Sequence, residues 1–396
     1  MNFKNQAISL KEELITIRRT LHQYPELGME EFETSKFIKN FLKNEGIEFI
    51  EVSNTGVCGI INGTKENIKI HKKTIALRGE IDGLPIADKK QCNYSSKIIG
   101  KMHACGHDAH TTILLGTAKI LNKNKHLFSG NVKLLFEPAE ETIGGARFMI
   151  EEGVLDNPKV DCICGLHVEE TLECGTTMVK HGVVNAASNP FTIRIKGSGG
   201  HGAYPHTTVD PIVIASHVVL GIQTIVSREI NTMNPTVITV GSIHGGTAKN
   251  IIPEEVEISG IIRTMSKEDR AFVKKRLVEI VEGICKSSRG SCEIDIDDSY
   301  PNLYNDNSMV DLFKLGAKKI IGKENILLQK NPKMGVESFA YFANEIPAVF
   351  YFLGSGNKNK NIIYPAHSSL FDIDEDCLPL GVAMQCQIVF EYLTRS

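Results

Sequence analysis

Thiol and imidazole side chains are concentrated in the segment 101–110, which holds Cys105 together with His103, His107 and His110. Thiolate and imidazole are the ligands preferred by zinc and similar divalent ions, and a thiolate can bridge two of them. A single cysteine or histidine is more often a packed core residue. One thiol and three imidazoles within ten residues favour a metal site, and we interpret Cys105 as a ligand shared by two ions.

Two adjacent carboxylates follow a short apolar run. The run 131–137 is typical of a buried strand, and Glu140 and Glu141 come directly after it. Neighbouring side chains on extended or turning backbone point in different directions, so Glu141 can bind metal while Glu140 holds a proton from the attacking water. The alternative is a solvated acidic start to a helix over 142–153, where glutamate favours the helix dipole.

Two more histidines stand at the ends of apolar runs. His167 ends the run 160–167, and His367 follows the apolar run 348–353. Open α/β sheets place their sites at the carboxyl ends of their strands, so these side chains are expected to converge. The sequence therefore predicts a hydrolytic centre for two metal ions, with Glu140 as the proton carrier and five ligands: Cys105, His107, Glu141, His167 and His367.

The elements that position these ligands belong to a chain of two domains, because 396 residues exceed the size of a single core. Between about 187 and 298 the pattern is β-α-β-β-α-β, the ferredoxin-like order. The predicted elements are strands at 191–196, 236–243, 256–263 and 292–297 and helices at 210–227 and 267–286, and Ser266 and Asp269 form a possible capping box. We expect an insert, 187–298, within a metal-binding domain made of 1–186 and 299–396.

A glycine-rich loop, Gly197–Gly202, contains His201. Such a loop could cradle phosphate, but the Gly-Lys-Ser/Thr ending of a P-loop is missing and no helix begins there at once. The loop is therefore a weak phosphate candidate.

Charge and composition exclude several partners. A net charge of −3 without a basic block predicts no binding to nucleic acid or acidic membrane. Residues 1–10 lack the apolar core of a signal peptide, and no run approaches a membrane span. The ten cysteines are scattered, which indicates reduced thiols. We expect a cytoplasmic protein.

Several motifs of the chain, in this order, resemble a known family: the di-metal amidohydrolases that include hippurate hydrolase, bacterial N-acyl-amino-acid amidohydrolases and plant indole-acetyl-amino-acid hydrolases. The resemblance covers nearly the whole chain. The motifs that carry it lie at 18–27, 77–86, 103–110, 138–141, 165–168, 199–203, 246–250 and 339–342. It implies an α/β metallopeptidase-like catalytic domain, a mixed sheet flanked by helices, with an inserted ferredoxin-like α+β lid and dimerisation domain.

The resemblance also implies roles for individual residues. Glu140 would be the general base and acid, and Asp82 would orient a metal ligand. His201 would come from the partner subunit of a homodimer or dimer-based oligomer and stabilise the oxyanion. Asn250 would lie nearby, and Arg263 would meet the substrate carboxylate; an exposed charge at a strand end is the alternative for Arg263.

The chain departs from the family pattern at a few positions. Glu80 stands where related peptidases carry a histidine ligand, so a carboxylate contact to metal is open there. Ser338 replaces a frequent aspartate, which puts the support of the metal ligands in question. Glu137 and Gly202 replace a frequent glutamine and alanine, and neither change removes a reacting group.

The expected activity is metal-dependent hydrolysis of N-acyl amino acids, hippurate-like or N-acetylated, to a carboxylic acid and a free amino acid. Two divalent ions are expected, manganese or zinc, with cobalt or nickel as further choices. A dipeptidase or aminopeptidase is an alternative, in which Glu337 or Glu80 would bind the substrate ammonium. A non-catalytic small-molecule-binding protein is another, although simple binding needs no carboxylate poised over a metal-bound water, the position expected for Glu140.

Overall fold

The structure is a computed structural model that describes residues 2–66 and 72–395. It divides into two compact units. Unit 1 comprises Met1–Val184, Tyr304–Asn331 and Glu337–Ser396, and unit 2 comprises Asn185–Leu303 and Pro332–Val336. The insert predicted from the sequence spans 187–298, inside the larger segment of unit 2.

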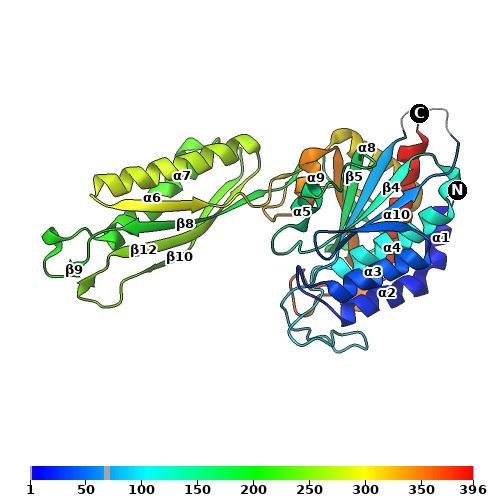
Figure 1. Cartoon of the computed structure of the whole chain (residues 1–396), viewed down its shortest axis with the longest axis horizontal. Helices are drawn as coiled ribbons and strands as arrows, with labels where there is room; N and C mark the ends of the chain where they lie inside the picture. Colours follow the sequence, from blue (N-terminus) through cyan, green and yellow to red (C-terminus); the bar gives the residue numbers. More distant parts are fainter. Residues whose placement is uncertain (1, 67–71, 396) are drawn as a thin grey trace. The chain divides into compact units, whose positions relative to one another are not determined.

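Unit 1 is built on an eight-stranded mixed sheet (Figure 1). In spatial order its strands are β1 (Glu48–Val52), β2 (Gly56–Asn62), β4 (Asn131–Glu137), β3 (Thr74–Glu80), β5 (Cys162–Glu173), β16 (Ala348–Gly356), β6 (Thr177–Val179) and β15 (Ile326–Leu328). The neighbours β4, β3, β5 and β16 run parallel, whereas β1 and β2 are antiparallel. The carboxyl ends of the four parallel strands therefore lie at one edge of the sheet.

Helices cover both faces of this sheet. They are α1 (Phe3–Ser9), α2 (Lys11–Gln23), α3 (Phe32–Asn44), α4 (His107–Lys123), α5 (Gly145–Glu151), α8 (Asn307–Ile321), α9 (Phe339–Glu345) and α10 (Cys377–Thr394), with short 3₁₀ turns at Lys125–Leu127 and Lys358–Lys360. A Cβ on Gly79 would meet the backbone of His110 in α4, and one on Gly165 would meet Phe339 in α9. Gly165 is paired with Arg78, the residue before Gly79, so α4 and α9 lie on opposite faces.

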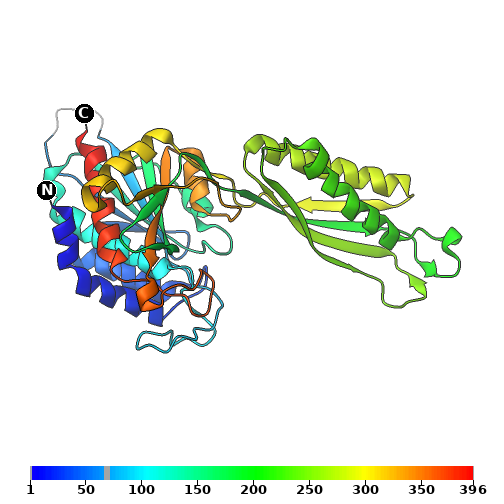
Figure 2. The ribbon, with the colours of Figure 1, turned by 180° about the vertical axis from the view of Figure 1, so that it is seen from behind.

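The close packing of α4 explains why every residue from His107 to Ala118 is buried. It contacts β3, α2 and α10 (Figure 2), and Gly116 lets α2 and α10 approach, because a Cβ there would lie 2.6 Å from Leu14 and 2.8 Å from Val382. The apolar helical pattern of the sequence begins at Thr111, whereas the helix itself begins at His107, so His107 stands on its first turn. The helix predicted over 142–153 is shorter than expected and forms only over Gly145–Glu151.

Unit 2 is a four-stranded antiparallel sheet with two helices on one face (Figures 1 and 2). Its elements are β8 (Ala187–Lys196), β9 (Gly200–His201), α6 (Pro211–Thr224), β10 (Thr236–Gly245), β11 (Ile251–Ile252), β12 (Glu255–Thr264), α7 (Lys267–Ser287) and β13 (Ser291–Ile296), with short helical turns at Pro205–Thr207 and Ile225–Glu229. The order β10-β12-β8-β13 is ferredoxin-like. Strands β7 (Gly182–Asn185) and β14 (Leu303–Asn305) form a separate pair.

Sequence periodicity accounts for the core of unit 2. Inward residues alternate along β8 at Phe191, Ile193 and Ile195, and buried residues recur every four positions in α7 from Val273 to Leu277 and beyond. Helix α7 is capped as predicted at its first turn, where the Ser266 hydroxyl accepts from the Asp269 amide at 3.0 Å. The predicted fold class, an α/β domain with a ferredoxin-like α+β domain, is confirmed.

One expectation about membrane segments is wrong. The stretch Pro211–Glu229, α6 with the turn that follows it, is long and apolar enough by composition to cross a membrane. In unit 2 this helix packs one side, including Ile214 and Val218, into the core formed with the sheet. Its apolarity therefore contributes to a core on that side, while Leu220 on the other side is 69% exposed.

Leu277→Ala in α7 tests the core of unit 2. Leu277 is fully buried, so removing three carbons should lower the free energy of unfolding by about 2–5 kcal/mol. Denaturant unfolding measures the change. The matched control is Leu220→Ala on α6, where exposure predicts a change of less than about 0.5 kcal/mol. Equal effects of the two substitutions would contradict this core.

Candidate metal centre

The ligands predicted from separate stretches come together at the carboxyl edge of the parallel strands. Cys105 Sγ lies 3.3 Å from His167 Nε2, and Glu141 Oε1 lies 3.2 Å from His367 Nε2 and 3.9 Å from His107 Nε2. His167 is on β5, and Glu141 follows β4. The convergence follows from the parallel arrangement of the strands, because each ligand leaves its strand at the same edge.

These side chains form two overlapping groups. Cys105, His107 and His167 make one, and Cys105, Glu141 and His367 make the other; within each, the possible ligand atoms lie within 4.8 Å of one another. Cys105 belongs to both, as expected for a shared ligand. His107 Nε2 is buried and has no hydrogen-bond partner among the described residues, and a buried polar atom of this kind needs a partner. A thiol, imidazoles and a carboxylate fit divalent ions of the zinc or manganese type.

Asp82 supports two of these ligands at once. Its Oδ1 lies 3.0 Å from His107 Nδ1, and its Oδ2 accepts from the Glu141 amide at 3.0 Å. With Nδ1 donating to Asp82, the Nε2 lone pair of His107 is left for a metal ion. Asp82 therefore occupies the orienting position that the resemblance implies.

The buried pair Glu80 and His110 lies beside the ligands but is already satisfied. His110 Nδ1 donates to Glu80 Oε2 at 2.8 Å, and its Nε2 accepts from the Val168 amide at 2.8 Å. These contacts leave no lone pair on the ring for metal. The pair instead fixes the backbone next to His167. This role was not predicted from the sequence, although the spacing of three between His107 and His110 places both on one side of α4.

Arg78 is fully buried and holds several carboxylates beneath the centre. Its Nε donates to Glu137 at 2.6 Å and one Nη to Glu337 at 2.8 Å, and it also pairs with Glu80. Burial opposes ionisation of Glu80, but Arg78 and then His110 hold its pKa well below the usual range. Burial raises the pKa of Glu337 to about 7. The carboxylates of Glu80 and Glu337 are therefore already engaged by Arg78 inside the protein.

Ser338 supports the general-base candidate through its backbone. The Ser338 amide donates to Glu140 Oε1 at 3.0 Å, and its hydroxyl contacts Arg78 and Glu137. Because the donor to Glu140 is a backbone group, a serine in place of the frequent aspartate leaves that hydrogen bond intact. Ser338, in place of the aspartate, is thus hydrogen-bonded to the same Arg78 and Glu137 side chains that pair with each other.

The pKa values of the two adjacent carboxylates are shifted in opposite directions. Burial, then the charges of Glu337 and Glu141, raise the pKa of Glu140 well above its usual range. Burial also opposes ionisation of Glu141, yet the hydrogen bond from His367 and the charge of His107 lower its pKa to about 2. Separated pKa values are what distinct acid–base and ligand roles require.

The two soft ligands are uncharged in the protein without metal. Burial lowers the pKa of His167 to about 3, so its imidazole is neutral. Burial, then the charge of Glu141, raise the pKa of the Cys105 thiol well above its usual range. A thiolate is the form that binds metal, so ion binding at Cys105 should release a proton.

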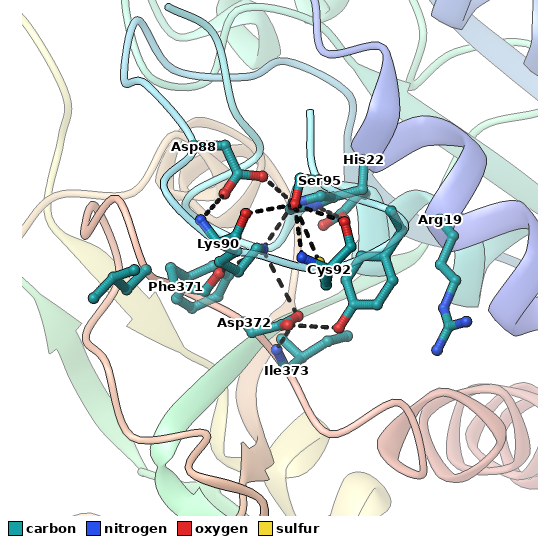
Figure 3. Close-up of polar contacts among 12 residues, drawn as sticks. Arg19, His22, Asp88, Lys90, Cys92, Ser95, Phe371, Asp372 and Ile373 are labelled. Atoms are coloured by element: carbon teal, nitrogen blue, oxygen red, sulfur yellow. Dashed lines mark hydrogen bonds and ion pairs between the residues drawn. The ribbon is translucent and has the colours of Figure 1, made fainter. Parts of the chain in front are cut away.

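A second polar network ties the surrounding loops to α4. Asp108, next to His107, accepts from Arg18 Nε at 2.9 Å and lies 2.7 Å from His22 Nδ1. Figure 3 shows Lys90 meeting His22 on one side and the segment at Phe371 on the other. Lys90 Nζ donates to the Phe371 carbonyl at 2.7 Å. This network joins α2 and the loops before α4 and α10.

His367 belongs to one of these loops and stands in a strained conformation. Its φ of 67° is in the left-handed region, and its amide donates to the Ala104 carbonyl at 2.7 Å. That hydrogen bond places His367 beside the loop that carries Cys105.

The remaining predicted site residues lie in unit 2. His201 on β9 accepts at Nδ1 from the Ala203 amide at 3.1 Å, so a neutral ring carries its proton on Nε2. The Asn250 carbonyl accepts from the Gly202 amide at 2.8 Å. On β12, burial lowers the pKa of Arg263, and its Nη1 is shielded and has no hydrogen-bond partner among the described residues.

Comparison with known proteins places this geometry in a family. The model of Peptidase family M20/M25/M40 matches residues 76–391. One similar solved structure is a Bacillus subtilis protein described as a dinuclear metal-binding peptidase of family M20. It superimposes with a TM-score of 0.82 and is 32% identical in sequence, and the match covers 97% of this chain and 99% of that chain.

Two relatives of known name match over most of their length. Thermostable carboxypeptidase 1 of Saccharolobus solfataricus is 37% identical over 99% of this chain and 98% of its own. N-acetyl-L-cysteine deacetylase of Bacillus subtilis is 40% identical over 93% of this chain and 86% of its own.

Gly106→Ala tests the backbone between two ligands. Gly106 has a φ of 86°, and an added Cβ would lie 2.3 Å from a methyl group of Val168, so Val168 or the first turn of α4 must move. We expect fewer ions per chain, measured by elemental analysis after dialysis. Gly100→Ala is the control: its φ is 77° with nothing within 4 Å, so it should cost about 1–2 kcal/mol of strain and leave the ions bound. Full ion content in Gly106→Ala would contradict the assignment.

Proposed function

The chain belongs to peptidase family M20/M25/M40, and from this premise we propose that it hydrolyses the amide bond of N-acyl amino acids, hippurate-like or N-acetylated, to a carboxylic acid and a free amino acid. It is a metal-dependent hydrolase of the amidohydrolase type. Substrates in this proposal are small molecules with a carboxylate next to the scissile amide.

The observation that carries the proposal is the position of Glu140. It belongs to a group with His107 and Glu141, whose possible ligand atoms lie within 4.8 Å of one another, and its Oε1 accepts from the Ser338 amide. A protein that only binds a ligand has no need of a buried carboxyl with a raised pKa beside metal ligands. This favours hydrolysis over the non-catalytic alternative.

Two divalent ions held by Cys105, His107, Glu141, His167 and His367 would supply an activated water and an electrophile for the substrate carbonyl. Glu140 takes a proton from the attacking water and later delivers it to the departing amine nitrogen. Asp82 keeps His107 in the tautomer that binds metal. His201, supplied by the partner subunit, donates its Nε2 proton toward the oxyanion, with Asn250 nearby.

Arg263 is proposed to bind the substrate carboxylate. Its unpaired, shielded Nη1 and lowered pKa describe a guanidinium that lacks an acidic partner within the described part of unit 2. The carboxypeptidase relative suggests a second candidate, a peptide with a free C-terminal carboxylate, because the same group lies next to its scissile amide. A panel of N-acyl amino acids and peptides separates the two.

An aminopeptidase or dipeptidase that needs a free substrate amine is less well supported. The acids considered for the ammonium, Glu80 and Glu337, are both held by Arg78, and at most 5% of either residue is exposed. Pairing with Arg78 disfavours binding of a substrate ammonium by either acid, since neither can leave Arg78 without stranding a buried charge.

The cofactor and assembly belong to the same proposal. Manganese or zinc is the proposed metal pair, with cobalt or nickel as substitutes, because the ligand set mixes thiol, imidazole and carboxylate. A cytoplasmic homodimer, or an oligomer built from it, is proposed from the family resemblance and from the need for His201 of a second chain.

Glu140→Gln is the direct test of the general base. The amide cannot take the proton, so kcat should fall by about 10²- to 10⁴-fold, while both ions stay bound. Release of amino acid from hippurate and N-acetyl amino acids, after reconstitution with manganese or zinc, measures the change. Near-normal turnover in the variant with its metals bound would rule out this role.

Arg263→Met tests recognition of the carboxylate. Loss of a charge-assisted hydrogen bond should raise KM for an N-acyl amino acid by about tenfold or more. The matched substrate is the same compound with its carboxylate converted to an amide, for which KM should change little. An equal rise for both substrates would show that Arg263 acts on the fold of unit 2 rather than on the carboxylate.

A further inference from the structure

The turn that delivers Glu140 and Glu141 contains a strained residue. Ala139 has a φ of 53°, in the left-handed region that side chains other than glycine rarely adopt. The turn comes between β4 and α5, and its shape decides where both carboxylates point. A conformation of this kind persists only when its surroundings hold it, so the contacts of Ala139 matter for the site.

A buried carboxyl far away in the sequence makes that contact. Glu31 is fully buried, and its Oε1 accepts from the Ala139 amide at 2.8 Å. Its Oε2 accepts from the Thr55 hydroxyl at 2.6 Å. Both donors are neutral, so Glu31 supplies directional hydrogen bonds rather than an ion pair. Burial, opposed by these hydrogen bonds, raises the pKa of Glu31 to about 7.

The loops around Glu31 are themselves strained and tightly packed. Met29, Ser53 and Asn54 have φ values of 66°, 51° and 68°, and Asn54 Nδ2 donates to the Met29 carbonyl at 3.1 Å. A Cβ on Gly28 would lie 2.9 Å from Ala139 Cα, so the loop before α3 rests directly on the turn. Strain concentrated around one buried carboxyl indicates a function beyond packing.

We propose that Glu31 is a positioning residue for the hydrolytic reaction: through the Ala139 amide it holds the turn that directs Glu140 and Glu141 into the metal centre. This rests on the proposed roles of Glu140 and Glu141. Glu31 touches neither substrate nor metal, and it acts only through the backbone of residue 139.

A structural explanation would be that Glu31 caps α3, which begins at Phe32. The side chain of Glu31 makes no cap hydrogen bond to that helix. Glu26 does this instead: its carboxylate accepts from the Thr34 amide and hydroxyl, each at 2.8 Å. Glu26 therefore provides a matched control, an acid in the same loop that stabilises α3 without touching Ala139.

The test compares Glu31→Met with Glu26→Met. Both remove a carboxylate and keep volume, but only Glu31→Met frees the Ala139 amide. Its kcat per metal-loaded chain should fall by about tenfold to a hundredfold, with KM within about threefold. Hydrogen exchange of the peptide covering 132–142 should quicken in Glu31→Met and not in Glu26→Met.

A conservative replacement of Glu31 distinguishes the loss of the hydrogen bond to Ala139 from a general loss of stability. Glu31→Gln keeps an oxygen that can accept from Ala139, so it should retain about a third or more of kcat. Where Glu31→Met fails to fold, Thr55→Val removes only the donor that orients the carboxylate and should give the same pattern at about threefold loss.

The proposal is overturned if kcat per loaded chain falls equally in Glu31→Met and Glu26→Met, or if exchange over 132–142 quickens with kcat unchanged. Where Thr55→Val replaces a Glu31→Met variant that does not fold, the proposal is also overturned if Thr55→Val changes neither kcat nor the hydrogen exchange of residues 132–142. If the wild-type protein binds two ions and hydrolyses no amide in the panel, the proposed function fails. Unchanged exchange in Glu31→Met would then reject the contact to the turn on its own.

Discussion

One of the buried cations, Arg78, joins the strand ends beneath the candidate metal centre. Arg78 lies on β3 with no exposure, and it binds Glu80 on its own strand, Glu137 at the end of β4 and Glu337 before α9. Removing one partner from such a cluster leaves an uncompensated buried charge, which is strongly destabilising. The ends of β3 and β4, which lead to Asp82 and to Glu140 and Glu141, are therefore held together with the segment before α9 before any ion binds.

The sequence was most informative where chemistry and periodicity coincide. The ligand cluster around Cys105 and the acids after β4 are conspicuous because those residue types are rare inside apolar runs. Burial and tautomers could not be predicted, because they depend on contacts distant in the sequence. His110 belongs to the cluster that indicated a metal site, yet its ring is satisfied by Glu80 and Val168. Helix bounds near the site also differed, because the glycine at 106 lets α4 begin directly at His107.

Supporting residues were harder to find from sequence than reacting ones. Glu31 reads as one acid in an acidic stretch, and only the contact across 108 residues to Ala139 distinguishes it. Ser338 reads as the loss of an acid, but its backbone amide makes the hydrogen bond that Glu140 needs. Any residue type except proline has a backbone amide, so a role that depends on a backbone hydrogen bond cannot be recognised from residue types. The contacts in the structure were needed to identify these two roles.

The proposed reaction requires a centre for two ions, in which Cys105 binds both ions and Glu140 binds neither. Anomalous diffraction from crystals grown with manganese, and separately with zinc, locates these ions. We expect two peaks that both contact Cys105, one next to Glu141 and His367 and the other next to His107 and His167, with Glu140 bound to neither. A single peak, or Glu140 as a direct ligand, would contradict it.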